Sequence, residues 1–209
     1  MRPSPEFDNP AGEAPVPDFA ATARYLEFWP KRELSDAEKG LATQMRAFCA
    51  FGLLPLLFIL HRGRLFDPAP LPAGVRRAPM KRCYKNAAEL AMADPQKYAY
   101  VEGYALSRFA VPHAWCVTRE GTVVDPTWES PGSSAYCGIP FDTNFLMRTL
   151  AESEAWGVFG EMVSVKTLGT PVSAMVHPWW RDELAGRAMW PQLEDWLRAV
   201  DAWPATAPG

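Results

Sequence analysis

Three residues in the middle of the chain have side chains that together could perform nucleophilic catalysis. His113 follows Cys83 by 30 residues, and Asp125 follows His113 by 12 residues. A thiol, an imidazole and a carboxylate are the parts of a nucleophile, its general base and the group that orients the base. Taken singly, a free cysteine more often fills space in a core. The catalytic interpretation therefore depends on whether the fold brings the three together.

The stretch from Val111 to Trp128 reads as two short strands joined by a tight turn, and its register decides whether His113 and Asp125 meet. A two-residue loop would place the two side chains on opposite faces. A three-residue loop, 119–121, puts them on one face as diagonal neighbours, roughly 7–8 Å apart at the backbone. Gly121 occupies the last position of that loop, where such hairpins favour glycine. An ordinary hairpin with a polar end is the competing interpretation.

Cys83 stands at the start of a predicted helix over 82–92, which Asp94-Pro95 ends. A thiol with a pKa near 8.5 is mostly protonated at neutral pH and becomes a good nucleophile where positive potential stabilises the thiolate. The positive end of the helix dipole would supply such potential, and so would His113 if it lies close. Three basic residues flank the cysteine: Lys81, Arg82 and Lys85.

Composition and charge exclude several classes of function. The chain has 209 residues, of which 48% are hydrophobic and 22% charged, as in a globular protein. The net charge of −3 gives no indication of a nucleic-acid-binding surface. The four cysteines form no C-x-x-C pair and there are three histidines, so we expect neither a zinc site nor a cofactor. We assign Cys49, Cys116 and Cys137 to packing, although Cys137 could lie near the cleft.

The first thirty residues contain no continuous apolar segment of the kind found in a secretion signal, so we expect a cytoplasmic protein with reduced thiols. The longest apolar run, from Ala47 to Leu60, has 14 residues, short of the roughly 20 that cross a bilayer, and Pro55 interrupts it. We expect a buried helix pair there, or a helix followed by a strand, rather than a membrane association.

One domain is predicted over 19–203, between a Pro-rich tail at 1–18, expected to be disordered, and a second tail at 204–209. Ser35 and Glu38 form a capping box that predicts a helix towards Phe51. The remaining predicted elements are a surface loop from Leu65 to Met80, a strand from Tyr98 to Leu106, a helix from Asp142 to Ala151, a strand from Val158 to Val165 and a final helix from Asp182 to Val200.

The motifs G-Y-A-L, P-H-A-W-C-V and G-T-V-V-D-P-T-W resemble the core of transglutaminase-like proteins, within the papain-like cysteine-enzyme superfamily. These proteins share a Cys at the head of a helix, H-A-W-x-x-V on one strand and an Asp in a D-P-T turn on the next. The resemblance implies an α+β fold in which a helix carrying Cys83 packs on an antiparallel sheet carrying His113 and Asp125. It also implies that Cys83 is the nucleophile, His113 the base and Asp125 the orienter.

The chemistry of that superfamily is acyl transfer through a thioester. We therefore predict a cysteine-dependent hydrolase, a peptidase or amidase, acting on a peptide, protein or amide, with Trp115 and Tyr104 lining the substrate site. The main-chain N–H of Cys83 is the default oxyanion donor, and Gln44 is a candidate second donor. Two alternatives remain open: an acyl transferase or transglutaminase that uses the same triad, and a non-catalytic binding module on this fold.

Overall fold

The structure, a computed structural model, describes residues 33–48, 54–128, 134–159 and 171–185. Its helices are α1 (Asp36–Phe48), α2 (Leu54–Arg62), α3 (Cys83–Ala93), α4 (Thr143–Ser153), α6 (Val172–Met175), the 3-10 helix η3 (Pro178–Trp180) and α7 (Arg181–Ala185). Its strands are β1 (Arg64–Phe66), β2 (Ala99–Leu106), β3 (Ala110–Val117), β4 (Val123–Val124) and β5 (Ala135–Phe141).

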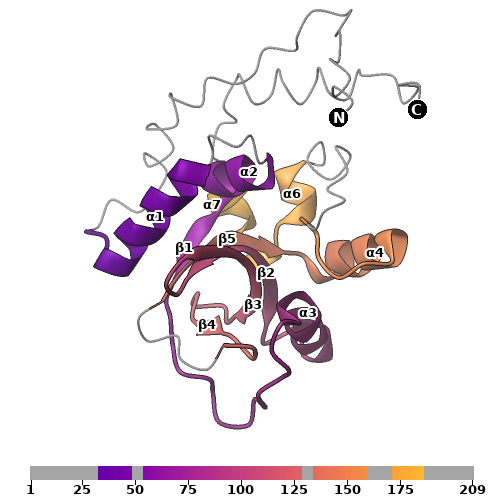
Figure 1. Cartoon of the computed structure of the whole chain (residues 1–209). Helices are drawn as coiled ribbons and strands as arrows, with labels where there is room; N and C mark the ends of the chain where they lie inside the picture. The colour runs from indigo at the N-terminus through magenta and orange to yellow at the C-terminus, as the bar shows by residue number, and fades with distance from the viewer. Residues whose placement is uncertain (1–32, 49–53, 129–133, 160–170, 186–209) are drawn as a thin grey trace, which may run out of the picture.

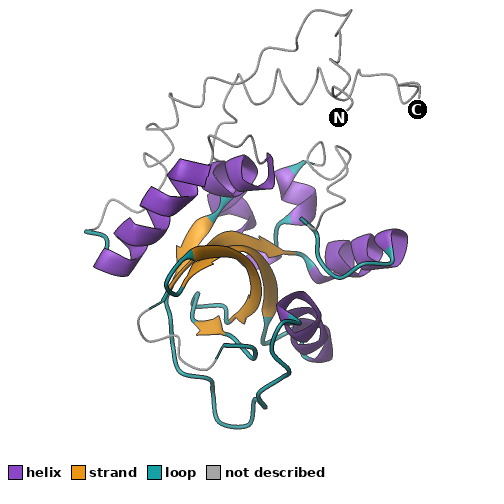
Figure 2. Ribbon diagram, viewed as in Figure 1, coloured by secondary structure: helices purple, strands orange, loops and turns teal. Residues whose placement is uncertain are grey.

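The strands form one antiparallel sheet in the order β1-β5-β2-β3-β4. Figure 1 shows that this sheet is strongly curled, with β4 inside the curl and helices α1, α2 and α3 outside it. Figure 2, in the same view, separates the curled strands from the helices that cover the outside of the sheet. The protein is therefore an α+β fold with an antiparallel sheet, as predicted, and the structure adds that this sheet is curled.

Two facing glycines allow the central strands to approach closely. Gly103 of β2 pairs with His113 of β3 on one side and with Gly138 of β5 on the other. A Cβ at Gly103 would lie 2.0 Å from the carbonyl oxygen of Cys137, and a Cβ at Gly138 would lie 2.5 Å from that of Glu102. Any side chain at either position would have to push the strands apart.

Helix α3 lies against the outside of the sheet because its inner face consists of small residues. Ala87, Ala88 and Ala91 are fully buried, so the helix backbone comes close to β3. The thiol of Cys116 donates to the carbonyl oxygen of Ala87 at 3.1 Å, which is a contact only a close approach permits. This packing fixes where the first residue of the helix, Cys83, lies relative to β3.

The predicted hairpin register is confirmed. Cys116 pairs with Val124 and Val117 with Val123, which leaves residues 119–121 as the loop. The N–H of Gly121 donates to the carbonyl oxygen of Thr118 at 3.0 Å, and Gly121 has the positive φ of 91° that this loop position requires.

The capping box before α1 is confirmed. The Ser35 N–H donates to Glu38 Oε2 at 2.8 Å, and the Glu38 N–H donates to Ser35 Oγ at 3.2 Å. The predicted helix over 142–151 is α4, for which Asp142 is the N-cap. The apolar run ends in helix α2, as one of the two alternatives predicted. Among the residues that the structure describes, no helix is long and apolar enough to span a membrane.

Some predicted elements differ from the structure. The loop predicted from Leu65 begins two residues too early, because Leu65 and Phe66 belong to the short strand β1, which pairs with β5. Val158 and Phe159 are not in a strand, since their main-chain N–H groups donate to the Glu102 carboxylate instead of to a neighbouring strand. The rest of that prediction, the tails at 1–18 and 204–209 and most of the final helix lie outside the described residues.

Candidate active site

His113 and Asp125 form a buried pair inside the curl of the sheet. His113 Nε2 lies 2.8 Å from Asp125 Oδ2, and the two residues are each 2% exposed. His113 belongs to β3, and Asp125 directly follows β4. The three-residue loop between the strands places both side chains on the same face, which is why the ring and the carboxylate meet.

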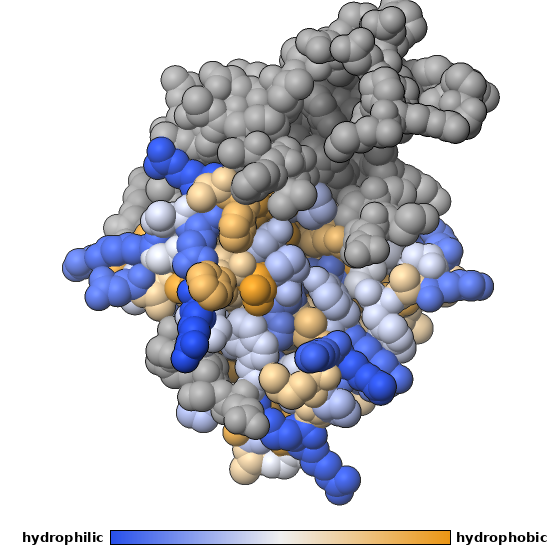
Figure 3. Space-filling model, in the orientation of Figure 1, coloured by the Kyte–Doolittle hydropathy of each residue, from blue (hydrophilic) through white to orange (hydrophobic). Residues whose placement is uncertain are grey.

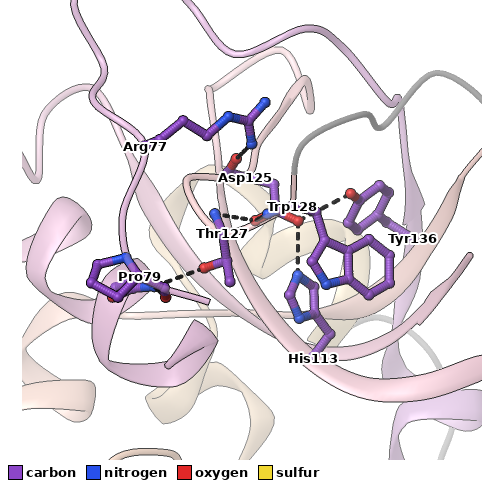
Figure 4. A network of polar contacts seen from close by, with 8 residues as sticks. Arg77, Pro79, His113, Asp125, Thr127, Trp128 and Tyr136 are labelled. Carbon is purple, nitrogen blue, oxygen red and sulfur yellow. Dashed lines mark hydrogen bonds and ion pairs between the residues drawn. The ribbon is translucent and has the colours of Figure 1, made fainter. Parts of the chain in front are cut away.

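The carboxylate of Asp125 is fixed by three further donors. Asp125 Oδ1 accepts from the main-chain N–H groups of Thr127 at 2.8 Å and Trp128 at 3.1 Å. Asp125 Oδ2, which faces His113, also accepts from the hydroxyl of Tyr136 at 3.1 Å (Figure 4). Burial favours the protonated acid, but His113 and the N–H donors outweigh burial and hold the pKa of Asp125 below its usual value. Asp125 is therefore a fixed anion.

The imidazole of His113 lies between aromatic rings. The indole of Trp128 is stacked on it, with ring centroids 4.3 Å apart. The centroid of the Trp115 ring lies 6.1 Å from that of the imidazole, with the two planes 20° from parallel. Burial opposes the charged imidazolium. The hydrogen bonds and charges of Asp125 and Cys83 outweigh burial, however, and raise the pKa of His113 to about 9. His113 is therefore protonated at neutral pH.

Cys83 is the first residue of α3 and is half-buried. Its thiol lies close enough to His113 for each group to shift the pKa of the other. Because Nε2 of the ring faces Asp125, the ring nitrogen that remains for the sulfur is Nδ1. Burial raises the pKa of Cys83, but the hydrogen bond and charge of His113 and the main-chain N–H groups of Ala114 and Tyr84 lower it below 9.0. The two shifts together favour a thiolate–imidazolium pair.

The three predicted residues Cys83, His113 and Asp125 thus lie together in one contiguous network. Asn86, one turn after Cys83 in α3, links the helix to the turn that follows Asp125. The Asn86 amide donates to Thr127 Oγ1 at 3.0 Å and to the carbonyl oxygen of Pro79 at 2.8 Å. The helix that carries the sulfur is therefore bonded directly to the turn that carries the carboxylate.

Sequence reasoning missed two residues of this network. Asn86 falls within the predicted helix over 82–92, and the sequence alone assigns Tyr136 no role in a site. The amide of Asn86 carried a weak signal, because a buried polar side chain inside a helix needs a partner. Tyr136 carried none, since its partner lies on another part of the chain.

The predicted substrate-lining residues are both buried. Trp115 is fully buried and Tyr104 is 6% exposed, so they support the site from within the protein, and their contact with a substrate stays a prediction. Gln44 Oε1 accepts from the N–H of Ala110 at 2.8 Å, which ties α1 to the start of β3. Cys116 and Cys137 are fully buried, and Cys49 lies outside the described residues.

A buried carboxylate fixes a loop beside the cysteine. Glu102 is 1% exposed and accepts from the main-chain N–H groups of Val158 and Phe159. This anchor places Gly157 against the ring of Tyr84, where a Cβ would lie 3.2 Å from Tyr84 Cδ1. The loop therefore forms a fixed wall next to the residue that follows Cys83.

In the part of the chain that the structure describes, no cluster of three or more His, Cys, Asp or Glu side chains is arranged to hold a metal ion. Comparisons with protein-family models, with curated proteins and with solved structures found no match to this chain.

Proposed function

We propose that the protein is a cysteine-dependent hydrolase, a peptidase or amidase, that works through a thioester on the triad Cys83, His113 and Asp125. The observation that carries this proposal is the series of neighbouring groups from sulfur to imidazole to carboxylate, in which the imidazole is bonded to the carboxylate, the pKa of the thiol is lowered and that of the imidazole is raised. A cysteine with only a packing role has no need of such a series.

The reaction follows from the positions of the protons. The Cys83 thiolate attacks the carbonyl carbon of an amide, and a carbon–sulfur bond forms as the carbonyl oxygen gains the negative charge. The carbon–nitrogen bond then breaks, and His113 gives its proton to the leaving amine. Water attacks the thioester while His113 accepts a proton from it. The carbon–sulfur bond breaks, the carboxylic acid leaves, and the thiolate and imidazolium are restored.

The negative oxygen of the intermediate needs a hydrogen-bond donor. No side chain caps the N-terminus of α3, where Arg82 is the N-cap residue. The main-chain N–H groups of Tyr84 and Ala114 donate to the sulfur. The N–H of Cys83 itself is therefore the donor that we assign to the oxyanion.

The arrangement of elements supports a papain-like, transglutaminase-like architecture as part of this proposal. A helix begins with the cysteine and packs outside a curled antiparallel sheet, in which one strand carries the histidine and the aspartate directly follows the next strand. This is the arrangement that the sequence motifs imply.

The test is the rate at which iodoacetamide labels Cys83 at near-neutral pH, with the labelled residue identified by mass spectrometry. We expect Cys83→Ala to abolish the fast labelling and His113→Gln to slow it by more than about 10-fold. The matched control is His177→Gln, because His177 is also buried but belongs to the turn before η3. Unchanged labelling in Cys83→Ala would assign the nucleophile to another cysteine and overturn the proposal.

A second measurement separates hydrolysis from acyl transfer. The thioester is resolved by water in a hydrolase and by an amine in a transferase. Incubation with peptide substrates, with and without a primary amine, yields stable amide adducts only in a transferase. We expect free carboxylic acid as the main product. A folded protein that labels at the rate of a free thiol and turns over no acyl compound would instead be a binding module.

A further inference from the structure

A group of basic residues lies next to Cys83. Between Asp67 and Glu89 the chain contains no acidic residue, and it contains five basic ones, although its net charge is −3. We call these five residues the basic rim: Arg76, Arg77, Lys81, Arg82 and Lys85. The first four are exposed and Lys85 is half-buried. Figure 3 shows strongly hydrophilic side chains on the lower part of the molecule, where the loop before α3 lies.

The loop that carries the basic rim is bonded to the triad, so the rim has a fixed place. The guanidinium of Arg77 donates to the main-chain oxygen of Asp125 at 3.4 Å, and Figure 4 shows this side chain reaching over Asp125. The next residue, Ala78, donates its N–H to the carbonyl oxygen of Pro126 at 2.9 Å. The charge of Arg77 therefore lies beside the main chain of Asp125, at the edge of the site.

The other end of the loop is equally constrained. Lys81 has a left-handed backbone, with φ at 65°, directly before Arg82 and Cys83. A lysine adopts that conformation only where its surroundings hold it there, and such residues cluster at functional sites. The side chains of Lys81 and Arg82 are both exposed.

Most of this positive charge has no ion-pair partner among the residues that the structure describes. Lys85 lies 3.6 Å from Glu89. Arg76, Lys81 and Arg82 form no ion pair with any other residue that the structure describes. Several exposed like charges on one short segment attract anionic molecules and raise their local concentration, more strongly at low salt.

We propose that the basic rim selects acidic polypeptides, so that the preferred substrate of Cys83 carries Asp or Glu residues close to the carbonyl group under attack. This rests on the function proposed above. A polypeptide fits both observations, since it supplies an acyl carbon for the thiolate and carboxylates for the rim. A nucleic acid would satisfy the charge but offers the thiolate no acyl group.

The experiment uses peptide chloromethyl ketones, which alkylate a cysteine with loss of chloride. One peptide has Glu at the second and third residues before the C-terminal chloromethyl ketone, one has Gln at the same positions and one has Lys. The labelling rate of Cys83 in the full chain is measured for each at low and at physiological salt. We expect the Glu peptide to react about 10–100-fold faster than the Lys peptide at low salt, and the ratio to fall as salt is added.

Charge reversal tests whether the rim is the cause. The variant Arg76→Glu/Lys81→Glu is compared with Lys97→Glu/Arg148→Glu, which makes the same change of charge at exposed residues outside the rim. We expect the Glu-to-Gln rate ratio to fall below one in the first variant and to stay at the wild-type value in the second. Equal ratios in the two variants would mean that the basic rim has no effect of its own, and would overturn the proposal.

The two proposals fail in different ways. If iodoacetamide labels Cys83 no faster than a free thiol, the proposed catalytic site fails and the rim loses its substrate. If iodoacetamide labels Cys83 rapidly but the Glu, Gln and Lys peptides react at equal rates, only the selection of acidic polypeptides fails. If an oligonucleotide blocks labelling by all three peptides equally while they react at equal rates, the rim binds a different polyanion and the proposal is wrong.

Discussion

The indole of Trp128 lies against the imidazole of His113, with ring centroids 4.3 Å apart and ring planes 22° from parallel. Trp128 is half-buried, so its outer face is in contact with solvent while its inner face covers the histidine. An aromatic face stabilises a cation that lies on it, and it also keeps water away from the pair that His113 forms with Asp125.

Replacing Trp128 by Ala should therefore lower the pKa of His113 by up to about one unit and slow Cys83 labelling several-fold, because the cation loses its aromatic neighbour. Trp128→Phe should keep most of the raised pKa of His113 and most of the labelling rate of Cys83, since a smaller ring can still stack. The measurement is the pH dependence of the iodoacetamide rate, with circular dichroism to confirm the fold. An effect of equal size in the Phe and Ala variants would contradict the stacking explanation.

Substitutions of Asp125 should separate its two roles. Asp125→Asn keeps an oxygen that can accept from the N–H groups of Thr127 and Trp128, but it removes the negative charge that stabilises the imidazolium. We expect turnover to fall by about 10²–10⁴-fold with a small change in stability. Asp125→Ala should lose the same activity. In addition, its free energy of unfolding should fall by about 1–3 kcal/mol for each main-chain donor left unpaired. Thermal unfolding and turnover, measured on both variants, check this.

The pH dependence of the protein follows from the shifted pKa values. Catalysis needs Cys83 ionised and His113 protonated, so the rate should rise as pH passes the lowered pKa of the thiol and fall as pH passes about 9. Stability has its own dependence. Because the pKa of His113 is raised from 6.5 to about 9, its contribution is complete below 6.5 and is lost as pH rises through about 9.

The contribution of Asp125 has the opposite sign. Its pKa is lowered, so the stability that it contributes is present above 3.8 and is lost as pH falls through the lowered value. Thermal unfolding midpoints measured across this range for wild type and His113→Gln test both statements. The difference between the two proteins should shrink as pH rises above about 9. A difference that stays constant with pH would mean that His113 is neutral in the folded protein.

Removing the hydroxyl of Tyr136 should act on the triad in the opposite direction to Asp125→Asn. The hydroxyl donates to the same carboxylate oxygen as His113, so it weakens the negative charge that Asp125 presents to the imidazolium. Tyr136→Phe should leave Asp125 a stronger partner for the ring, and we expect the alkaline limb of the pH profile to move upward while turnover changes less than about 10-fold. A downward shift would show that the hydroxyl mainly positions the carboxylate.

Those parts of the site that depend on local rules could be predicted from the sequence. The type of loop that ends in Gly121 sets the register of the hairpin, and the register alone decides that His113 and Asp125 share a face. The start of α1 is likewise fixed by Ser35 and Glu38, which are three residues apart. In each case the interacting groups are close in the chain, so spacing carries the information.

The parts that were missed depend on contacts between distant segments. Asn86 and Thr127 are 41 residues apart, and no periodicity links them. Strand β1 has three residues, too few to form an alternating pattern, and it exists through its pairing with β5. The alternation along β3 places Trp115 on the same face as His113. It does not reveal that the sheet curls over this face and buries Trp115 against Phe66 and Tyr136.

The close approach of β2 and β5 supplies a test of the fold that is independent of the chemistry. Gly103→Ala places a methyl group 2.0 Å from the carbonyl oxygen of Cys137, and backbone atoms cannot rotate away as a side chain would. We expect the free energy of unfolding to fall by at least about 1–3 kcal/mol, with a lower unfolding midpoint. Cys83 labelling should also be slower, because the neighbouring strand carries His113. Gly40→Ala is the control. It lies in helix α1, where alanine is favoured by up to about 1 kcal/mol, and the atom it meets is the flexible end of Leu106 at 3.2 Å. If the two variants unfold at the same temperature, strands β2 and β5 are not as close as described.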